Sequence, residues 1–252
     1  MRSFVPTMGA LHAGHAELIR RAREISDEVV VSIFVNPLQF ENPEDLEKYP
    51  HTPEQDEVLA RNAGATRIWF PTYEEIYPAG FTKLSAGPLG SLFEGASRPG
   101  HFDGVVTVVR RLFDLVTPDV ALFGEKDFQQ LALVRTIAEN VEIIAVPIVR
   151  ERDGLALSSR NIRLSSEGRK AAPIIHQAMM AASVQKTVAS MAAVLREKLD
   201  SQPLFTTDYA EIVDVQSFQK ANDATADKRA LVAGWIDGVR LIDNMAMNGG
   251  GR

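Results

Sequence analysis

Hydrophobic and polar positions in the first half of the chain alternate between short apolar runs and amphipathic stretches with helical spacing. The apolar runs are rich in β-branched and aromatic residues, and they predict strands at Ser3 to Pro6, Val29 to Val35, Arg67 to Phe70, Val120 to Phe123 and Glu142 to Val149. Several runs are apolar on both faces, as in strands that helices cover on both sides. The pattern therefore predicts an α/β fold with a parallel sheet.

The amphipathic stretches predict three helices in this half, at His15 to Ile25, Pro53 to Asn62 and Gly104 to Val116. Gly64 can end the second helix in a left-handed cap, and Pro118 stops the third before the next strand. The third helix is almost wholly apolar, so we expect it to be deeply packed.

The pattern changes after Ser159, where helices are followed by strands instead of alternating with them. The expected elements are a long helix that Ser165 caps and that runs to about Gln185, a helix from Val188 to Leu199, strands at Tyr209 to Val213 and Arg229 to Ile236, and a final strand from Val239 to Ile242 that completes a hairpin at Asp237-Gly238. We therefore expect a larger domain over residues 1–148 and a smaller C-terminal α+β domain over residues 149–252.

Composition narrows the classes of function. The 252 residues include 33 acidic and 27 basic side chains, a net charge of -6, and no cysteine. The negative charge disfavours broad binding of nucleic acids or anionic membranes, and the lack of cysteine excludes disulfides and thiolate nucleophiles. No apolar run reaches the ~18 residues that span a bilayer, and the N-terminus does not resemble a signal peptide. We expect a cytoplasmic protein with no nucleic-acid or membrane partner.

Two histidines and two glycines follow the first predicted strand. The segment Met8 to His15 opens the first predicted helix, at the place where an open α/β sheet usually binds its ligand. Gly9 and Gly14 allow close approach of a phosphate, and the helix N-terminus and the imidazoles of His12 and His15 supply donors. These features favour phosphate binding over the two alternatives, a turn capped by one histidine and a metal-binding histidine pair.

Two polar segments lie between this loop and the third helix. Asn36 and Gln39 follow the second predicted strand, where neutral amides can bind hydroxyl and carboxylate groups, although an Asn-Pro turn with solvated amides is the favoured interpretation of this segment taken alone. Glu94 to Phe102 contains Arg98 and His101 among turn-forming residues. It fits a loop that closes over phosphates and also an ordinary exposed connection.

Two more polar segments follow later strands. Gly124 to Gln130 places Lys126 at the start of a helix, which is unfavourable unless an anion offsets its charge, and Asp127 and Gln130 have the spacing of a capping box. Leu157 to Asn161 offers hydroxyls and a guanidinium that can hold an anion, although a serine-rich turn is the simpler interpretation. Together the loops predict a phosphate site at the carboxyl edge of the sheet.

The motifs carry a resemblance over nearly the whole chain. Five segments occur in the order found in the pantothenate synthetase family, which belongs to the nucleotidylyl-transferase superfamily. They are Pro6 to His15, Phe34 to Phe40, Glu94 to Phe102, Phe123 to Gln130 and Val146 to Asn161. The resemblance implies a Rossmann-like sheet in an ATP- and pantoate-binding domain, with a Ser-Ser-Arg loop from the C-terminal domain. It also implies a cytoplasmic homodimer that condenses pantoate with β-alanine, using ATP and Mg²⁺, through a pantoyl adenylate.

The resemblance also assigns residues, while the metal ligands stay unassigned. The implied catalytic residues are His15, His12, Lys126, Ser159 and Arg160. The implied ATP contacts are Met8, Gly9, Ala10, Leu11, His12, Ala13, Gly14, His15, Gly124, Glu125, Lys126, Asp127, Val149, Leu157, Ser158, Ser159 and Arg160. The implied substrate contacts are Gln39 and Gln130, with Asn36, Glu94, Arg98 and His101 as further candidates. We interpret His15 as a phosphate ligand rather than a proton donor, because the pantoate carboxylate is already a nucleophile.

Two other functions share parts of this pattern. A nucleotidylyl transferase that keeps the nucleotide in its product has the same histidine loop and Ser-Ser-Arg loop. A nucleotide-binding regulator without catalysis shares the fold. The implied substrate amides of Gln39 and Gln130 favour an acid substrate over the transferase, and the presence of every residue that the resemblance assigns argues against the regulator.

Overall fold

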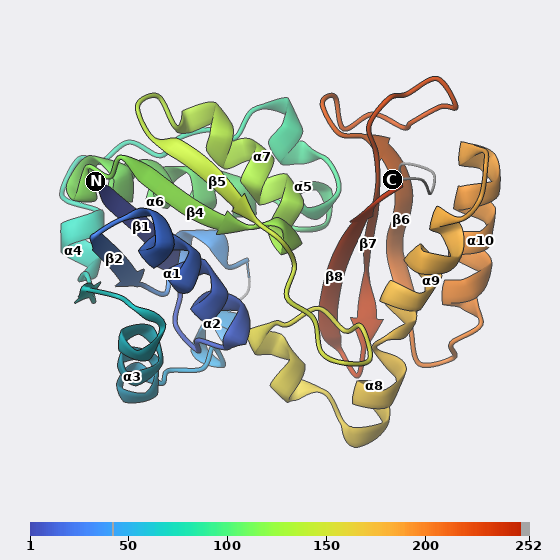
Figure 1. Ribbon diagram of the computed structural model, residues 1–252, viewed down its shortest axis with the longest axis horizontal. Helices are drawn as coiled ribbons and strands as arrows, with labels where there is room; N and C mark the ends of the chain where they lie inside the picture. Colours follow the sequence, from blue (N-terminus) through green and yellow to red (C-terminus); the bar gives the residue numbers. More distant parts are fainter. Residues whose placement is uncertain (42, 248–252) are drawn as a thin grey trace. The chain divides into compact units, whose positions relative to one another are not determined.

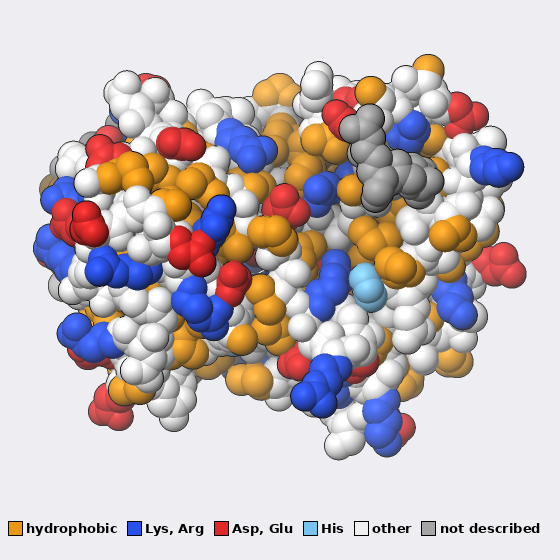
Figure 2. Space-filling view, in the orientation of Figure 1, with side chains coloured by type: hydrophobic (Ala, Val, Ile, Leu, Met, Phe, Trp, Pro, Cys, Tyr) orange, Lys and Arg blue, Asp and Glu red, His pale blue; other side chains and the backbone are white. Residues whose placement is uncertain are grey.

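The computed structural model describes residues 1–41 and 43–247 and divides into two compact units, Met1–Val149 and Arg150–Arg252 (Figure 1). This division lies one residue from the boundary expected from the sequence. On the face that Figure 2 shows, Lys and Arg side chains are interspersed with Asp and Glu. No helix in the described part of the chain is long and apolar enough to cross a membrane.

A five-stranded parallel sheet forms the centre of the first unit, with strand order β3-β2-β1-β4-β5 among the described residues. The strands are β1 (Arg2–Thr7), β2 (Glu28–Ile33), β3 (Arg67–Trp69), β4 (Val120–Gly124) and β5 (Glu142–Val146). The predicted parallel α/β fold is confirmed. The fifth strand is shorter than predicted because Pro147 has no N–H for the ladder. Strand order reverses between β1 and β4, so their carboxyl ends flank a crevice of the kind that binds ligands.

Helices cover both faces of this sheet (Figure 1). The helices of the first unit are α1 (Ala13–Ile25), α2 (Pro43–Glu47), α3 (Pro53–Ala63), α4 (Tyr73–Ile76), α5 (Glu94–Ser97), α6 (His101–Val116) and α7 (Phe128–Ile137), with 3-10 turns η1 (Pro37–Gln39), η2 (Pro88–Ser91) and η3 (Glu125–Asp127). In β1, Val5 packs with α1 and α3, whereas its neighbour Phe4 packs with α6 and α7. Alternating side chains thus build two cores from one sheet.

Glycines with positive φ mark two of the helix ends in the first unit. Gly64, with φ of 112°, ends α3 as predicted. Helix α6 begins at His101 after Gly100, whose φ is 79°, and so starts three residues before the prediction. Gly104 permits a close approach inside α6, because a Cβ there would lie 2.3 Å from the carbonyl oxygen of Leu38. Turn η1 can therefore pack directly on α6.

The second unit has a three-stranded antiparallel sheet of order β6-β7-β8 among its described residues. Its elements are η4 (Ser159–Arg163), α8 (Ser166–Ala171), α9 (Ile174–Ser183), α10 (Val188–Asp200), β6 (Thr206–Asp214), β7 (Lys228–Ile236) and β8 (Val239–Ala246). Helices α9 and α10 share one hydrophobic core with the sheet. The α+β character and the final hairpin are confirmed, and Asp237 and Gly238 both have positive φ, as a tight primed turn requires.

The single long helix predicted to run to Gln185 is wrong. Ser165 caps its start as expected, since Ser165 Oγ accepts a hydrogen bond from the Gly168 amide at 3.0 Å. The helix then breaks between α8 and α9 at Pro173, because proline cannot donate the helical hydrogen bond and clashes with the preceding turn.

Candidate active site

The candidate site of the first unit begins at the N-terminus of α1, where two histidines form a reciprocal cap. His12 Nδ1 accepts a hydrogen bond from the Gly14 amide at 3.1 Å, and His15 Nδ1 accepts one from the His12 amide at 3.2 Å. Because each Nδ1 is an acceptor, the proton of each neutral ring is on Nε2. The ring centroids are 4.2 Å apart. Both histidines therefore cap the helix, whereas the capping alternative expected only one to do so, and an Nε2–H donor remains on each ring.

Both rings are held in the neutral form. Burial, followed by the neighbouring His12, lowers the pKa of His15 to about 3. Burial, followed by the positive charge of Lys126, lowers the pKa of His12 to about 4, while Asp127 acts in the opposite direction on both rings. At neutral pH the two histidines can donate hydrogen bonds to an anion, but they have no surplus proton to transfer as a general acid.

We expect the ring resonances of His12 and His15 to stay unchanged between pH 8 and pH 5.5 in an NMR titration with selectively labelled histidine, because the folded state disfavours the cation. The unfolded rings protonate near 6.5, so the contribution of these groups to stability is lost as pH falls from that value towards 4. Free histidine in the same tube provides the reference. A midpoint near 6.5 for either ring would contradict the neutral pair.

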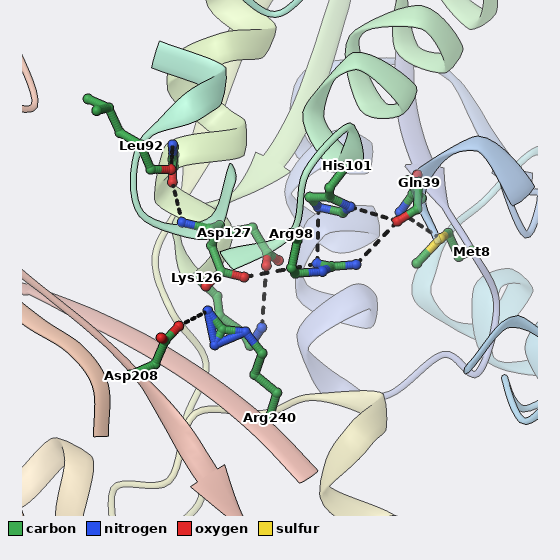
Figure 3. A network of polar contacts seen from close by, with 11 residues as sticks. Met8, Gln39, Leu92, Arg98, His101, Lys126, Asp127, Asp208 and Arg240 are labelled. Atoms are coloured by element: carbon green, nitrogen blue, oxygen red, sulfur yellow. Dashed lines mark hydrogen bonds and ion pairs between the residues drawn. The ribbon is translucent and has the colours of Figure 1, made fainter. Parts of the chain in front are cut away.

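Gln39 is held in place by a chain of buried amide contacts. The Tyr77 hydroxyl donates to Asn36 Oδ1 at 2.7 Å, and Asn36 Nδ2 donates to Gln39 Oε1 at 3.0 Å and to the Gly104 carbonyl at 3.1 Å. Gln39 Nε2 then points to Met8 Sδ, at 3.0 Å (Figure 3). Burial raises the pKa of the Tyr77 phenol, which keeps its proton available. The order of donors fixes the amide orientation of Gln39.

Arg98 and His101 contact the backbone of Gln39 from the other side (Figure 3). His101 Nδ1 donates to the Gln39 carbonyl at 2.8 Å, and Arg98 Nη2 donates to the same oxygen at 3.2 Å. Arg98 Nη1 lies 3.2 Å from His101 Nε2, and the guanidinium forms an ion pair with Glu94 at 4.0 Å. Arg98 and His101 are therefore part of a packed network and not of an exposed connection, and here they support the residue predicted to bind substrate.

Lys126 lies in η3, directly after β4. Its Nζ is 3.4 Å from Asp127 Oδ1, and its charge lowers the pKa of both loop histidines. The predicted capping box between Asp127 and Gln130 is wrong, since the Asp127 side chain makes no capping hydrogen bond to α7. Asp127 has ψ of 61° at the end of a 3-10 turn, not the extended conformation that a capping residue needs.

The adjacent glutamines of α7 have different environments. Gln129 is 5% exposed; its Nε2 donates to the carbonyls of Leu89 and Leu92 at 2.8 Å each, and its Oε1 accepts from the Glu94 amide at 3.2 Å. Gln130 is half-buried and makes no side-chain hydrogen bond within the part of the chain that the structure describes. The amide of Gln130 is thus the one that can serve a ligand.

The Ser-Ser-Arg segment belongs to the second unit. Ser158 caps η4, accepting a hydrogen bond from the Arg160 amide at 3.3 Å, and Asn161 Nδ2 donates to the Ala156 carbonyl at 3.0 Å. Leu157 and Ser159 flank the cap, and Val149 is the last residue of the first unit. Locally the segment is the serine-rich turn that the sequence indicated.

The structure adds two residues that the sequence pattern did not single out, Tyr77 in the Gln39 network and Asp56 beside the histidine loop. No group of three or more His, Asp or Glu side chains suited to a metal ion occurs among residues 1–41 and 43–247.

Comparisons with known proteins agree over nearly the whole chain. The profile of the pantoate–β-alanine ligase family matches residues 2–246. A pantothenate synthetase from Thermus thermophilus is 50% identical over 252 residues, covering 96% of this chain and 91% of the relative. The pantoate–β-alanine ligase of Schizosaccharomyces pombe is 45% identical over 254 residues, covering 96% and 90%.

Solved structures lead to the same family. A crystal structure of the Thermus thermophilus synthetase matches with a TM-score of 0.93 and 47% identity, covering 98% of this chain and 93% of that one. The Francisella tularensis ligase, complexed with β,γ ATP and β-alanine, matches with a TM-score of 0.81 and 35% identity over 99% and 90% of the two chains. The chain therefore belongs to the pantoate–β-alanine ligase family, and its activity is the ligation of pantoate to β-alanine that gives pantothenate.

Proposed function

We propose that the first unit binds the triphosphate of ATP at the N-terminus of α1 and binds pantoate beside Gln39 and Gln130. The observation that carries this proposal is the pair of neutral Nε2–H donors on His12 and His15, next to Lys126, at the point where strand order reverses. The Francisella relative, whose structure is a complex with an ATP compound and β-alanine, supports the choice of ligands.

The proposed reaction has two steps. A pantoate carboxylate oxygen attacks the α-phosphorus of ATP, the bond from that phosphorus to the bridging oxygen breaks, and pyrophosphate leaves with the electron pair. The amine of β-alanine then attacks the carbonyl carbon of the adenylate, the carbon–oxygen bond to AMP breaks, and the amine nitrogen loses a proton. The first step needs alignment and charge neutralisation more than a base.

The side chains of the first unit suit that requirement. Lys126 would offset the charge that develops on pyrophosphate, and the two imidazoles would donate to phosphate oxygens without adding charge of their own. The Tyr77–Asn36–Gln39 chain would present the Gln39 amide in one orientation to pantoate and later to β-alanine. These are stabilising and orienting roles, so His15 is not needed as a proton donor.

Magnesium fits the donor set as an ion held mainly by phosphates. Mg²⁺ usually keeps several waters and binds through one or two carboxylates together with substrate phosphates. Asp127 supplies one carboxylate close enough to the loop histidines to raise their pKa. When bound, the ion would neutralise phosphate charge, and Asp127 would orient it.

Other parts of the proposal come from the resemblance. It predicts nucleotide contacts by Gly124, Glu125, Val149, Leu157, Ser158, Ser159 and Arg160. Catalytic roles for Ser159 and Arg160, a homodimeric assembly and a cytoplasmic location are predictions as well.

An exchange assay tests the proposed chemistry. With ATP, Mg²⁺, pantoate and labelled pyrophosphate but no β-alanine, label should enter ATP at a rate that depends on pantoate. Adding β-alanine should then release AMP and pantothenate. A ligase that showed no pantoate-dependent exchange would exclude a reversible adenylation step. Exchange without β-alanine-dependent product would favour a transferase that keeps the nucleotide.

The two glutamines of α7 give a matched pair of variants. Gln130→Ala should lower kcat/KM for pantoate about tenfold, the loss of one hydrogen bond to a charged group, and leave the free energy of unfolding unchanged. Gln129→Ala should lower the free energy of unfolding by about 2 kcal/mol, because it removes the acceptor of the Glu94 amide and the donor to the carbonyls of Leu89 and Leu92. Urea unfolding and pantoate kinetics separate the two effects. The opposite pattern would reject Gln130 as the substrate ligand.

A further inference from the structure

A buried carboxylate on α3 holds the loop between β1 and α1. Asp56 is 2% exposed, and its Oδ1 accepts a hydrogen bond from the Leu11 amide at 2.7 Å while its Oδ2 accepts one from the Ala10 amide at 3.0 Å. The Thr52 hydroxyl donates to Oδ1 at 3.1 Å. Both carboxylate oxygens are therefore used, and two of these three bonds come from consecutive backbone amides of the loop.

The loop backbone adopts the conformation that makes such amides converge. Gly9 has φ of 86° and Ala10 has φ of 50°, so two successive residues lie in the left-handed region. Consecutive backbone amides in a turn can form a concave nest that binds anions, and here the amides of Ala10 and Leu11 converge on one carboxylate. A Cβ on Gly9 would lie 3.0 Å from Asp56 Oδ2 and 3.3 Å from Ile33 Cγ2, so glycine suits this position for space as well as for φ. The anion in this nest is the protein's own carboxylate.

The occupied nest limits how the loop can bind a nucleotide. The amides of Ala10 and Leu11 donate to Asp56, so the ATP contacts predicted at these two residues cannot use those amides while the bonds to Asp56 persist. The loop can still offer the Nε2–H groups of His12 and His15. Side chains, not these backbone amides, would then contact the phosphates.

The same contacts set the position of both ends of the loop. On one side of the nest, Met8 Sδ accepts from Gln39 Nε2, and on the other side His12 caps the N-terminus of α1. A shift of the nest would move the sulfur and the imidazoles together. Holding reacting groups in place can be worth about two orders of magnitude in rate, even when the residue responsible is remote from the chemistry.

We propose that Asp56 is a positioning residue for the adenylation step: by filling the anion nest of the loop, it fixes His12 and His15 where they bind the phosphates of ATP. This inference rests on the proposed nucleotide site. The carboxylate also lies in the first turn of α3, where the partial positive charge of the helix N-terminus favours an anion.

Asp56→Asn is the decisive variant because an asparagine has one acceptor oxygen. In either orientation its NH₂ group faces one of the two loop amides, so one of them loses its acceptor. We expect kcat/KM for ATP to fall by roughly 10- to 100-fold, mainly through a higher KM for ATP, while KM for pantoate changes less than about threefold. Thr52→Val removes the hydroxyl bond and spares both amide bonds, so we expect a rise of roughly two- to threefold in KM for ATP.

Asp103→Asn is the matched control. Asp103 lies on another helix, α6, and its Oδ1 also accepts a backbone hydrogen bond, from the Ala86 amide at 2.8 Å. The positioning role would be overturned if both asparagine variants lost thermal stability while the ATP kinetics of Asp56→Asn stayed within about twofold of the parent. If Asp56→Asn does not fold, Thr52→Val decides instead, and a KM for ATP equal to that of the parent within experimental error would overturn the role.

Lys126→Ala, measured in the same ATP titration, separates this inference from the site on which it rests. Unchanged ATP kinetics in Asp56→Asn alone would reject the role of Asp56. If the ATP kinetics were unchanged in both Asp56→Asn and Lys126→Ala, the proposed nucleotide site would be rejected together with the role of Asp56.

Discussion

Replacing Lys126 with alanine is expected to slow adenylation by roughly 10²- to 10³-fold, about 3 kcal/mol, the usual loss for one charge-stabilising donor in an active site. Lys126 follows β4 at the point where strand order reverses, and its charge acts on both loop histidines. Removing it withdraws the cation that would offset the charge on the departing pyrophosphate. The rate of pyrophosphate exchange into ATP, with pantoate and without β-alanine, measures this step directly.

Lys126→Arg is the matched variant for this prediction. It keeps the positive charge but replaces a compact ammonium with a planar guanidinium, so we expect a rate between those of the parent and the alanine variant. Equal rates in all three proteins would show that Lys126 does not act on the phosphates.

Replacing His15 with alanine is expected to slow adenylation by a similar amount, about 3 kcal/mol, and two further variants identify the ring nitrogen responsible. His15→Asn keeps an acceptor near the position of Nδ1 and can preserve the bond from the His12 amide, but it has no donor where Nε2–H lies. His15→Gln extends a donor towards the Nε2 position and loses the cap. We therefore expect asparagine to retain stability and glutamine to retain more of the rate.

Exchange rates and urea unfolding of the three variants check this prediction. The cap should account for about 1 kcal/mol of the free energy of unfolding, which separates the alanine and asparagine variants. An asparagine variant with a near-normal rate of adenylation would mean that the Nε2–H group of His15 does not bind phosphate, and that the histidine pair has only a capping role.

Much of the fold is predictable because local signals and the final structure agree. The run around Val5 and Phe4 is apolar on both sides, and both faces of β1 are indeed covered by helices. The turn at Asp237-Gly238 and the left-handed Gly64 have the expected conformations. The helix predicted to run from Ser165 to about Gln185 breaks at Pro173, because proline cannot continue the helical hydrogen bonds.

The candidate site is less predictable where it depends on distant contacts. Asp56 shares its helix with the acidic residues Glu54 and Glu57, and nothing local shows that it alone meets amides 45 and 46 positions earlier in the chain. Tyr77 contacts Asn36 across 41 positions, and its pattern is that of an ordinary core aromatic. Loop motifs identify residues that can bind a phosphate, whereas the residues that orient them depend on packing.

Transfer of labelled oxygen tests the adenylate mechanism most directly. Pantoate labelled with ¹⁸O in both carboxyl positions is incubated with ATP, Mg²⁺, β-alanine and the protein, and the AMP is analysed by mass spectrometry. If a carboxylate oxygen attacks the α-phosphorus and stays with AMP when the amide bond forms, each AMP molecule gains one ¹⁸O atom. AMP formed together with pantothenate but without the label would contradict the account.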